Sequence, residues 1–558
     1  MLPHAPQSRL PTHEVVNMPP YLGDQDLWQH DVVLREAVER EGGGWAASHL
    51  AALGREAGRA ETFYQADLAN RYAPELKTFD RYGMRVDQVE FHPAYHALMQ
   101  CAIEHEVHSF AWNHKRNGSH VAHGALTYMF QQVEGGVMCP MAMTYSALPS
   151  LETTPSVAAE WIPRLLSNTY DARDIPVEQK SGATMGMFMT EKQGGSDVRA
   201  NSTKAVPAGS DEGIGAPYRI TGHKFFSSAP MCDAFLMLAY SEGGLSCFLV
   251  PRWQPNGERN TLYLQRLKDK LGNRSNASSE IEFHDAHGIM VGEEGRGVRT
   301  IIDMVQHNRF YCTSASAGMM RQGLRQALHH VTHRTAFQRR LVDQPLMRNV
   351  LADLALEVEA AVAYALRVGR AIDEREHDPM AAALARIGTA IGKYWVCKRA
   401  PAHVGESLEC LGGAGYIEEN GIARLYREAP LNGIWEGSGN VICLDVHRAL
   451  QREQAALPAV IAELDQAKGG NSHLDRAAQA LRDDLGDLAD FELRARSITE
   501  RMAVTLQAAL LVRYAPNAVA DAFCATRLGD RWTGAYGTLP RGCGLTAILS
   551  RIAPGEGE

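Results

Sequence analysis

The feature that most constrains the fold is a block of short, β-rich segments between two long helical blocks. Between residues 185 and 290, runs at 218–222, 235–240 and 246–251 are rich in β-forming residues and are separated by Gly, Pro and Ser. The run at 279–284 alternates polar and apolar residues. Strands at such short spacing predict a small β-barrel or sandwich.

Helical patterns surround this block. Residues 96–108 place apolar side chains at helical spacing, and residues 351–366 carry apolar stripes with few helix breakers. Helices, then strands, then helices predict an α+β chain of segregated blocks rather than an alternating βαβ fold. We expect four parts along the chain: an N-terminal arm and helical domain (1–180), a β-barrel domain (181–295), a helical bundle domain (296–450) and an appended C-terminal helical domain (451–558).

Composition excludes several classes of protein. The 558 residues carry a net charge of -9, so the chain as a whole is not a basic nucleic-acid binder, although a local basic face stays open. The ten cysteines include no CxxC pair, and the histidine pairs lack a metal-ligand spacing, so we expect no metal. The N-terminus does not resemble a secretory signal, and the most apolar run, 502–512, is too short for a membrane span. We expect a cytoplasmic protein without a membrane segment.

A glycine-rich loop follows a Met-rich stretch. Residues 189–197 read Met-Thr-Glu-Lys-Gln-Gly-Gly-Ser-Asp. Two adjacent glycines let backbone N–H groups come close to a ligand, and the hydroxyls of Thr190 and Ser196 can donate to ring atoms or to a pyrophosphate. An ordinary β-turn is the competing interpretation.

A second candidate segment, at 222–228, reads Gly-His-Lys-Phe-Phe-Ser-Ser. The ring of Phe226 could cover one face of a planar cofactor, and the hydroxyls that follow it could donate to that cofactor. The alternative is a core strand with a polar end.

The sharpest motif is the turn at 434–440, Ile-Trp-Glu-Gly-Ser-Gly-Asn. It places one carboxylate, that of Glu436, between an aromatic residue and a Gly-Ser-Gly turn. A carboxylate in a dry site is a better base near neutral pH because burial disfavours its charged form. A backbone N–H at the turn can stabilise an enolate-like oxygen. A surface glutamate in a glycine-rich turn is the alternative.

These three segments, in this order, resemble those of the flavin-dependent acyl-CoA dehydrogenases. The resemblance implies an FAD cofactor and a glutamate that removes the α-proton of an acyl thioester while the flavin takes a hydride from the β-carbon. Glu436 would be that base. The family's Trp-Ile-Thr aligns with residues 226–228, where the middle position contributes mostly backbone. The implied flavin contacts in the three segments are Met189, Thr190, Ser196, Phe226, Ser227, Ser228, Trp435, Gly437, Ser438 and Asn440.

The resemblance also bears on other positions around the reaction. Some family members carry the base on an early helix of the C-terminal bundle, but the matching stretch here offers no acid after Asp303. Arg309 matches a family arginine near the acyl site, with a salt bridge on the helix surface as the alternative.

Two further segments resemble family sequences that contact FAD across a subunit interface. Gly412 and Gly413 lie in Leu-Gly-Gly-Ala-Gly-Tyr at 411–416. Arg334 and Phe337 match the first parts of the family's Arg-x-x-Phe-Gly, in which Gln338 replaces the glycine.

Longer strings around residues 189, 266 and 435 resemble the alkylation-response branch of this superfamily. That branch implies a homotetramer, weak acyl-CoA dehydrogenase activity of the isovaleryl-CoA type, and binding of double-stranded DNA. Candidate phosphate contacts are Arg448, Arg527 and Arg531, each with a salt-bridged surface arginine as the alternative. A metabolic short- or branched-chain acyl-CoA dehydrogenase with no DNA role stays open.

Overall fold

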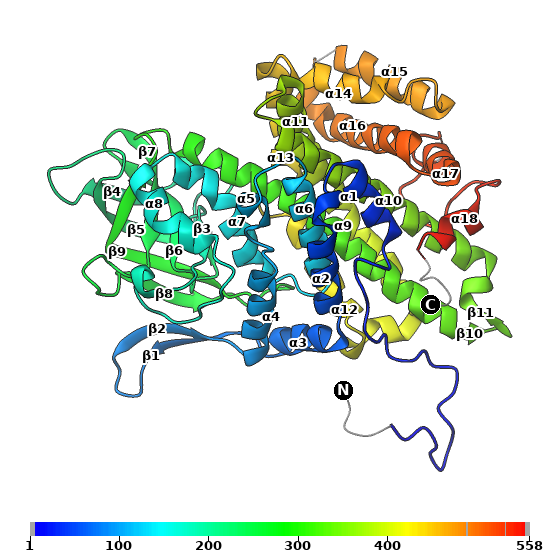
Figure 1. Ribbon diagram of the computed structural model, residues 1–558, viewed down its shortest axis with the longest axis horizontal. Helices are drawn as coiled ribbons and strands as arrows, with labels where there is room; N and C mark the ends of the chain where they lie inside the picture. The colour runs from blue at the N-terminus through cyan, green and yellow to red at the C-terminus, as the bar shows by residue number, and fades with distance from the viewer. Residues whose placement is uncertain (1–5, 487–488, 531, 553–558) are drawn as a thin grey trace. The chain divides into compact units, whose positions relative to one another are not determined.

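The computed structural model describes residues 6–486, 489–530 and 532–552 (Figure 1). The chain forms two compact units, and neither unit is one continuous segment. Unit 1 contains Met1–Phe63, Arg116–Val133 and Cys312–Glu558, and unit 2 contains Tyr64–Lys115 and Glu134–Tyr311. The strand-rich block predicted from the sequence lies in unit 2, and the α+β class with segregated helices and strands is confirmed.

Unit 2 is built on a seven-stranded barrel. Its sheet follows the order β3-β6-β4-β5-β9-β7, β8 pairs with β9, and a further β6–β7 pairing closes the ring. The parallel pairs are β3–β6 and β4–β6, and the others are antiparallel. The strands are β3 (Met185–Phe188), β4 (Lys204–Pro207), β5 (Pro217–Ser228), β6 (Ala234–Ser241), β7 (Gly244–Pro251), β8 (Leu262–Leu267) and β9 (Ser278–Val291).

The helices of unit 2 include α4 (Pro93–Glu104), α5 (Phe110–Asn113), α7 (Met138–Glu152) and α8 (Pro155–Leu165). The proline at the start of α4 suits the first helical turn, where its missing N–H costs no hydrogen bond. α7 packs against both α8 and β3.

Unit 2 also contains a hairpin that the sequence did not predict, because residues 1–180 are expected to form an arm and a helical domain. The hairpin joins β1 (Glu75–Phe79) to β2 (Arg85–Glu90). Its residues are largely exposed or half-buried, so they lack the apolar alternation that marks a strand in a sequence. The hairpin is held from outside, since the Arg85 guanidinium donates to the carbonyl oxygen of Leu264 at 2.7 Å.

Unit 1 is a helical bundle. α9 and α3 each pass from one unit into the other. α10 and α11 begin with proline, and Asp378 caps α11 by accepting from the Met380 N–H. The bundle elements are α1 (Val32–Arg40), α2 (Ala47–Ala57), α3 (Ala60–Arg71), α6 (Ser119–Gln131), α9 (Gly297–His333), β10 (Thr335–Ala336), β11 (Arg339–Arg340), α10 (Pro345–Glu374), α11 (Pro379–Glu409), α12 (Ile422–Glu428) and α13 (Gly439–Arg452).

The C-terminal extension packs directly on this bundle. It consists of α14 (Ala456–Asp465), α15 (Ser472–Gly486), α16 (Phe491–Tyr514), α17 (Asn517–Arg527) and α18 (Leu545–Ser550). α16 lies along α10, α11 and α13, as the orange helix in Figure 1 shows. The extension therefore shares the core of unit 1.

A buried ion-pair cluster joins the extension to the bundle and corrects one prediction. Arg527 reaches Asp353 at 2.6 Å and Glu357 at 3.0 Å, and Arg399 also reaches Glu357, at 3.2 Å. The side chain of Arg527 is 1% exposed. The prediction that Arg527 contacts a DNA phosphate is wrong, because two carboxylates hold its guanidinium inside the protein.

Within the described ranges, no helix combines the length and the apolar character that a membrane span requires.

Candidate active site

The glycine-rich loop after β3 is anchored by a buried ion pair. The Glu191 Oε1 accepts from the Lys224 Nζ at 2.8 Å, and both side chains are 0% exposed. Lys224 lies on β5 and also donates to the carbonyl oxygen of Leu238 at 2.9 Å. The loop is therefore tied to two strands of the barrel by one lysine.

Further donors saturate the Glu191 carboxylate. It accepts from the Thr203 hydroxyl at 2.6 Å and from the Ser202 N–H at 2.6 Å. Burial acts to raise the pKa of the Glu191 carboxyl, but Lys224 and these hydrogen bonds outweigh it and lower the pKa to about 2. Glu191 and Lys224 lie inside the predicted motifs, but the sequence gives them no role, since nothing in it pairs residues 33 positions apart.

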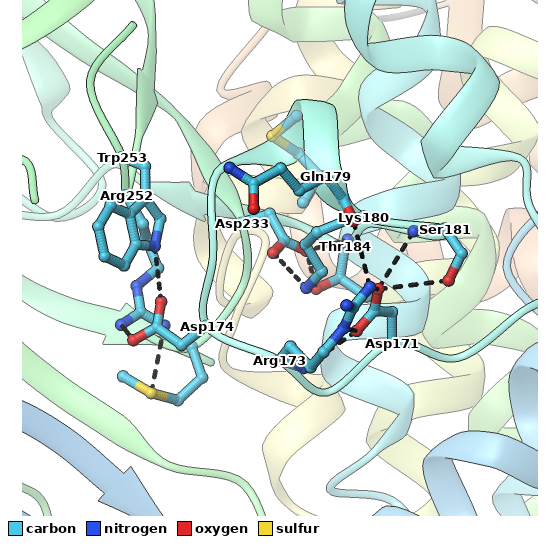
Figure 2. Close-up of polar contacts among 12 residues, drawn as sticks. Asp171, Arg173, Asp174, Gln179, Lys180, Ser181, Thr184, Asp233, Arg252 and Trp253 are labelled. Carbon is cyan, nitrogen blue, oxygen red and sulfur yellow. Dashed lines mark hydrogen bonds and ion pairs between the residues drawn. The ribbon is translucent and has the colours of Figure 1, made fainter. Parts of the chain in front are cut away.

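A second ion pair fixes the strand that leads into this loop (Figure 2). Lys180 precedes β3 and Asp233 precedes β6, the strand that pairs with β3 in parallel. The Lys180 Nζ donates to Asp233 Oδ1 at 2.6 Å, and the Thr184 N–H donates to Asp233 Oδ2 at 2.8 Å. Asp233 therefore aligns the starts of both strands, which sets where Met189 begins the loop.

The segment before β3 also borders a cavity of about 120 Å³ within unit 2. One wall is apolar and includes Tyr95 and Met99 of α4. The polar part of the lining includes Asp174, whose carboxylate accepts from the Arg252 guanidinium at 2.8 Å and from the Trp253 indole N–H at 2.9 Å (Figure 2). The charged groups of this part are bonded to one another, so the network rigidifies the approach to β3.

The predicted flavin face on β5 shows strand alternation. Phe226 is 49% exposed, Ser228 is half-buried and Ser227 is buried. Phe226 and Ser228 therefore share one face, while the Ser227 side chain points into the barrel. The Ser227 carbonyl accepts from the Ser279 hydroxyl at 2.9 Å. Because, of these three residues, only Phe226 and Ser228 lie on the outer face, a planar ligand would meet the ring of Phe226 and the hydroxyl of Ser228.

Lys268, to which the sequence gives no role, lies beside this face. The Lys268 Nζ is 3.5 Å from the ring centroid of Phe225 and 4.5 Å from that of Phe226, a cation–π arrangement. It also donates to Glu280 at 2.9 Å. Lys268 lies within the string that begins at Arg266, but the sequence gives it no role, because only the fold brings Glu280 of β9 beside it.

The residues of the 189–197 loop and of the outer face of β5 fit a flavin. A Cβ added to Gly195 would meet only the Thr190 methyl group, at 3.7 Å, so the loop leaves room for close approach to its backbone. Ser196 is exposed on the same loop. Arg309, also in unit 2, is buried on α9.

The acidic turn belongs to unit 1 and has a strained backbone. Glu436 lies between a short 3₁₀ turn (Leu431–Gly433) and α13, with φ of 58°. Gly437 follows with φ of 104°. A left-handed conformation costs a non-glycine residue about 1–2 kcal/mol, and such strain gathers at functional sites.

Buried polar groups support the turn from the bundle. The Trp435 indole N–H donates to Asn432 Oδ1 at 2.8 Å, and the Asn432 amide donates to the Ser316 hydroxyl at 3.1 Å. The Lys393 Nζ of α11 donates to the carbonyl oxygen of Gly437 at 2.5 Å. Asn440, at the start of α13, accepts from the Arg496 guanidinium at 2.8 Å, and Ser438 is the N-cap residue of that helix.

The predicted interface residues of unit 1 are exposed or half-buried. Phe337 and Gln338 form the two-residue turn between β10 and β11, with φ of 52° and 62°. Such a turn needs left-handed residues at both positions, which explains why glycine suits position 338 in relatives. Phe337 is 94% exposed. Arg334 donates to the carbonyl oxygen of Asn17 at 2.8 Å.

The other two interface glycines lie in a short 3₁₀ turn, Gly412–Tyr416. Gly412 has φ of 59°, and a Cβ at either Gly412 or Gly413 would meet nothing within 4 Å. Arg448 is half-exposed and pairs with Asp445 at 3.4 Å. Arg531 lies outside the described residues.

A barrel with a flavin-compatible loop, followed by a helical bundle with an acidic turn, defines the class: an acyl-CoA dehydrogenase. The model of the acyl-CoA dehydrogenase middle domain matches residues 186–286, and that of the C-terminal domain matches residues 295–451. The model of the adaptive response protein AidB N-terminal domain matches residues 17–172.

Individual relatives agree with this class. AidB of Escherichia coli is 44% identical over 93% of this chain and 95% of its own length. Acyl-CoA dehydrogenase family member 11 of Caenorhabditis elegans is 31% identical over 72% of this chain and 66% of its own length. The crystal structure of Caenorhabditis elegans ACDH-11 with C11-CoA superposes with a TM-score of 0.84 at 26% identity, covering 96% of both chains.

The chain belongs to the AidB family of acyl-CoA dehydrogenases. It is an FAD-dependent oxidoreductase of the type that acts on CH–CH bonds.

Proposed function

We propose that this protein serves the adaptive response to DNA alkylation, binds double-stranded DNA and keeps weak dehydrogenase activity on an acyl-CoA of the isovaleryl-CoA type, with Glu436 as the catalytic base. The observation that carries the proposal is the strained, bundle-supported turn at Glu436. A left-handed glutamate before a glycine is costly to hold, and the family relation supplies a reason to hold it.

In the proposed reaction, the Glu436 carboxylate takes the α-proton of the thioester. The backbone N–H of Glu436 stabilises the developing enolate oxygen. Bound FAD supplies the acceptor for the hydride that leaves the β-carbon. Phe226 and Ser228 would contact the flavin ring, the 189–197 loop would hold the cofactor through its backbone and hydroxyls, and Arg309 would act near the acyl group.

Acyl-CoA as the substrate class is supported by the C11-CoA complex of the Caenorhabditis elegans relative. The acyl chain itself is the part to be found by experiment, by mixing the protein anaerobically with a panel of acyl-CoAs that includes isovaleryl-CoA and following flavin bleaching.

The decisive variant is Glu436→Gln. We expect flavin bleaching by the best acyl-CoA to slow about 10²–10⁴-fold, since general-base catalysis is worth that much. FAD content and reduction by dithionite should be unchanged. Glu376→Gln makes the same charge change at an exposed site of unit 1 and should match the wild type. Equal bleaching rates for Glu436→Gln and wild type would refute the assignment.

Double-stranded DNA is the second proposed partner, through the kinship with adaptive-response proteins. Many arginines of the extension are engaged by acids, among them Arg482 with Asp465 and Arg513 with Glu463. Arg448, whose side chain is 57% exposed, is the predicted contact that the described residues leave accessible, and Arg531, outside those residues, stays a prediction.

Replacement of Arg448 by alanine should weaken duplex binding and reduce the salt dependence of log K by about one phosphate contact. An unchanged salt slope would remove Arg448 from the interface. Fast, complete bleaching by one acyl-CoA together with no duplex binding would instead support the metabolic alternative, a short- or branched-chain dehydrogenase with no DNA role.

A homotetramer is the proposed assembly. It is supported by exposed apolar side chains on both segments expected to meet a neighbouring subunit: Phe337 at 94% and Tyr416 at 85% exposure. Sedimentation of a monomer at micromolar concentration would contradict it. A cytoplasmic location is supported by the ten free cysteines.

A further inference from the structure

A lysine is buried directly beneath the acidic turn. Lys393 lies in the middle of α11 and is 1% exposed. Lysine is among the residues least often buried, because its ammonium group loses its hydration. α11 packs against both α13 and the 3₁₀ turn before Glu436. A buried lysine at this position therefore needs a partner that compensates for the hydration it has lost.

The partner of Lys393 is a main-chain carbonyl. Its Nζ donates to the oxygen of Gly437, 44 residues away, at 2.5 Å. One turn further along α11, Cys397 lies in a small cluster with Cys312 and Ser316. Burial raises the pKa of both the Cys312 and the Cys397 thiol, so these neighbours favour the neutral thiol form and offer Lys393 no negative charge.

This one hydrogen bond constrains the turn where it is most strained. Glu436 and Gly437 both have left-handed φ values. This conformation costs Glu436 free energy, so without a further contact the turn would favour other backbone conformations. The peptide between Gly437 and Ser438 is planar. A carbonyl held toward Lys393 fixes the orientation of that whole plane, and with it the direction in which the chain leaves Gly437, the residue directly after Glu436.

We propose that Lys393 is a positioning residue for the reaction: by holding the Gly437 carbonyl, it keeps the Glu436 carboxylate and the Glu436 N–H in their reactive orientation. The proposal rests on the proposed function of Glu436. Lys393 itself moves no proton and touches no substrate. Its role is to select one backbone conformation of the turn.

The test compares Lys393→Met, Lys393→Gln and Lys393→Arg in the full-length, FAD-loaded protein. Met removes the donor, whereas Gln keeps an N–H and Arg keeps both donor and charge. Lys398→Met is the matched control, because Lys398 is exposed on the same helix. The measured quantities are the flavin bleaching rate at saturating acyl-CoA, the apparent Kd of that acyl-CoA, and the FAD content.

A misplaced catalytic group costs about 10²-fold, so Lys393→Met should slow saturated bleaching by about 10–100-fold. The apparent Kd should change less than about 3-fold. Lys393→Arg should recover most of the rate, and Lys398→Met should behave as wild type. If Lys393→Met folds poorly, Lys393→Gln replaces it in the rate-against-affinity comparison, and because its uncharged amide is one bond shorter than the lysine chain, it should show a smaller loss of the saturated rate.

Two outcomes separate this inference from the function it rests on. If Glu436→Gln abolishes bleaching but Lys393→Met and Lys393→Gln bleach at the wild-type rate, the positioning role is wrong and the base assignment stands. If Glu436→Gln itself bleaches normally, the proposed function fails first. A change in Kd or FAD content alone, with an unchanged saturated rate, would also overturn the positioning role.

Discussion

The glycine-rich loop of unit 2 and the acidic turn of unit 1 are each held by a fully buried lysine, and the two lysines are held in different ways. In unit 2, Lys224 pairs with the Glu191 carboxylate. In unit 1, Lys393 binds the carbonyl oxygen of Gly437. The first arrangement neutralises two charges inside the barrel. The second binds a lysine ammonium group to the carbonyl directly after Glu436, the residue whose carboxylate the proposed reaction needs.

The difference shows what each region requires. A cofactor loop must be rigid, and a carboxylate saturated by Lys224, Thr203 and Ser202 makes it so. Burial lowers the pKa of Lys224 to about 8, although Glu191 opposes the shift. A catalytic turn must also be rigid, but a lysine paired with the base would hold the base too tightly. Binding the adjacent carbonyl fixes the backbone instead.

The largest expected effect is on stability, and it should separate the two lysines. Lys224→Met leaves the Glu191 carboxylate buried without its cation, which should cost about 3–5 kcal/mol. Lys393→Met leaves only a carbonyl unsatisfied, which should cost about 1–3 kcal/mol. Urea denaturation of both variants measures the difference.

The double variant Lys224→Met/Glu191→Gln provides the control for this comparison. It removes both charges and keeps one acceptor oxygen at position 191, so it should recover much of the loss. Equal losses for Lys224→Met and Lys393→Met would mean that the two lysines are held in equivalent ways.

A smaller effect should appear in acid. The pKa of Glu191 in the folded protein, about 2, lies below its ordinary value of 4.5. Its contribution to stability is therefore complete above about pH 4.5 and is lost as the pH falls toward 2. Between these values, the wild type should lose more stability than the Lys224→Met/Glu191→Gln variant, as measured by urea midpoints.

For the acidic turn, we expect no such difference between variant and wild type in the same experiment. The partner of Lys393 is a carbonyl, which does not titrate, so Lys393→Met should lose stability in acid in parallel with the wild type. A divergence of those two curves below pH 4.5 would show that a carboxylate near the turn depends on Lys393.

Much of the fold and of the chemistry could be read from the sequence. The strand-rich block, the helices on both sides, the 189–197 loop and the Glu436 turn are local patterns, so a short stretch of chain contains their whole signal. The hairpin at 75–90 was missed because its residues are too polar to show a strand pattern, and Leu264 holds it from far along the chain.

The sequence by itself determined which family the chain resembles and which residues are candidates for its chemistry, because those motifs are contiguous. Only the tertiary structure decided how they are held: the burial of Arg527, the inward side chain of Ser227, and the partners of Lys224 and Lys393, 33 and 44 residues away. Burial and long-range hydrogen bonds arise from packing between distant segments, so no local pattern records them.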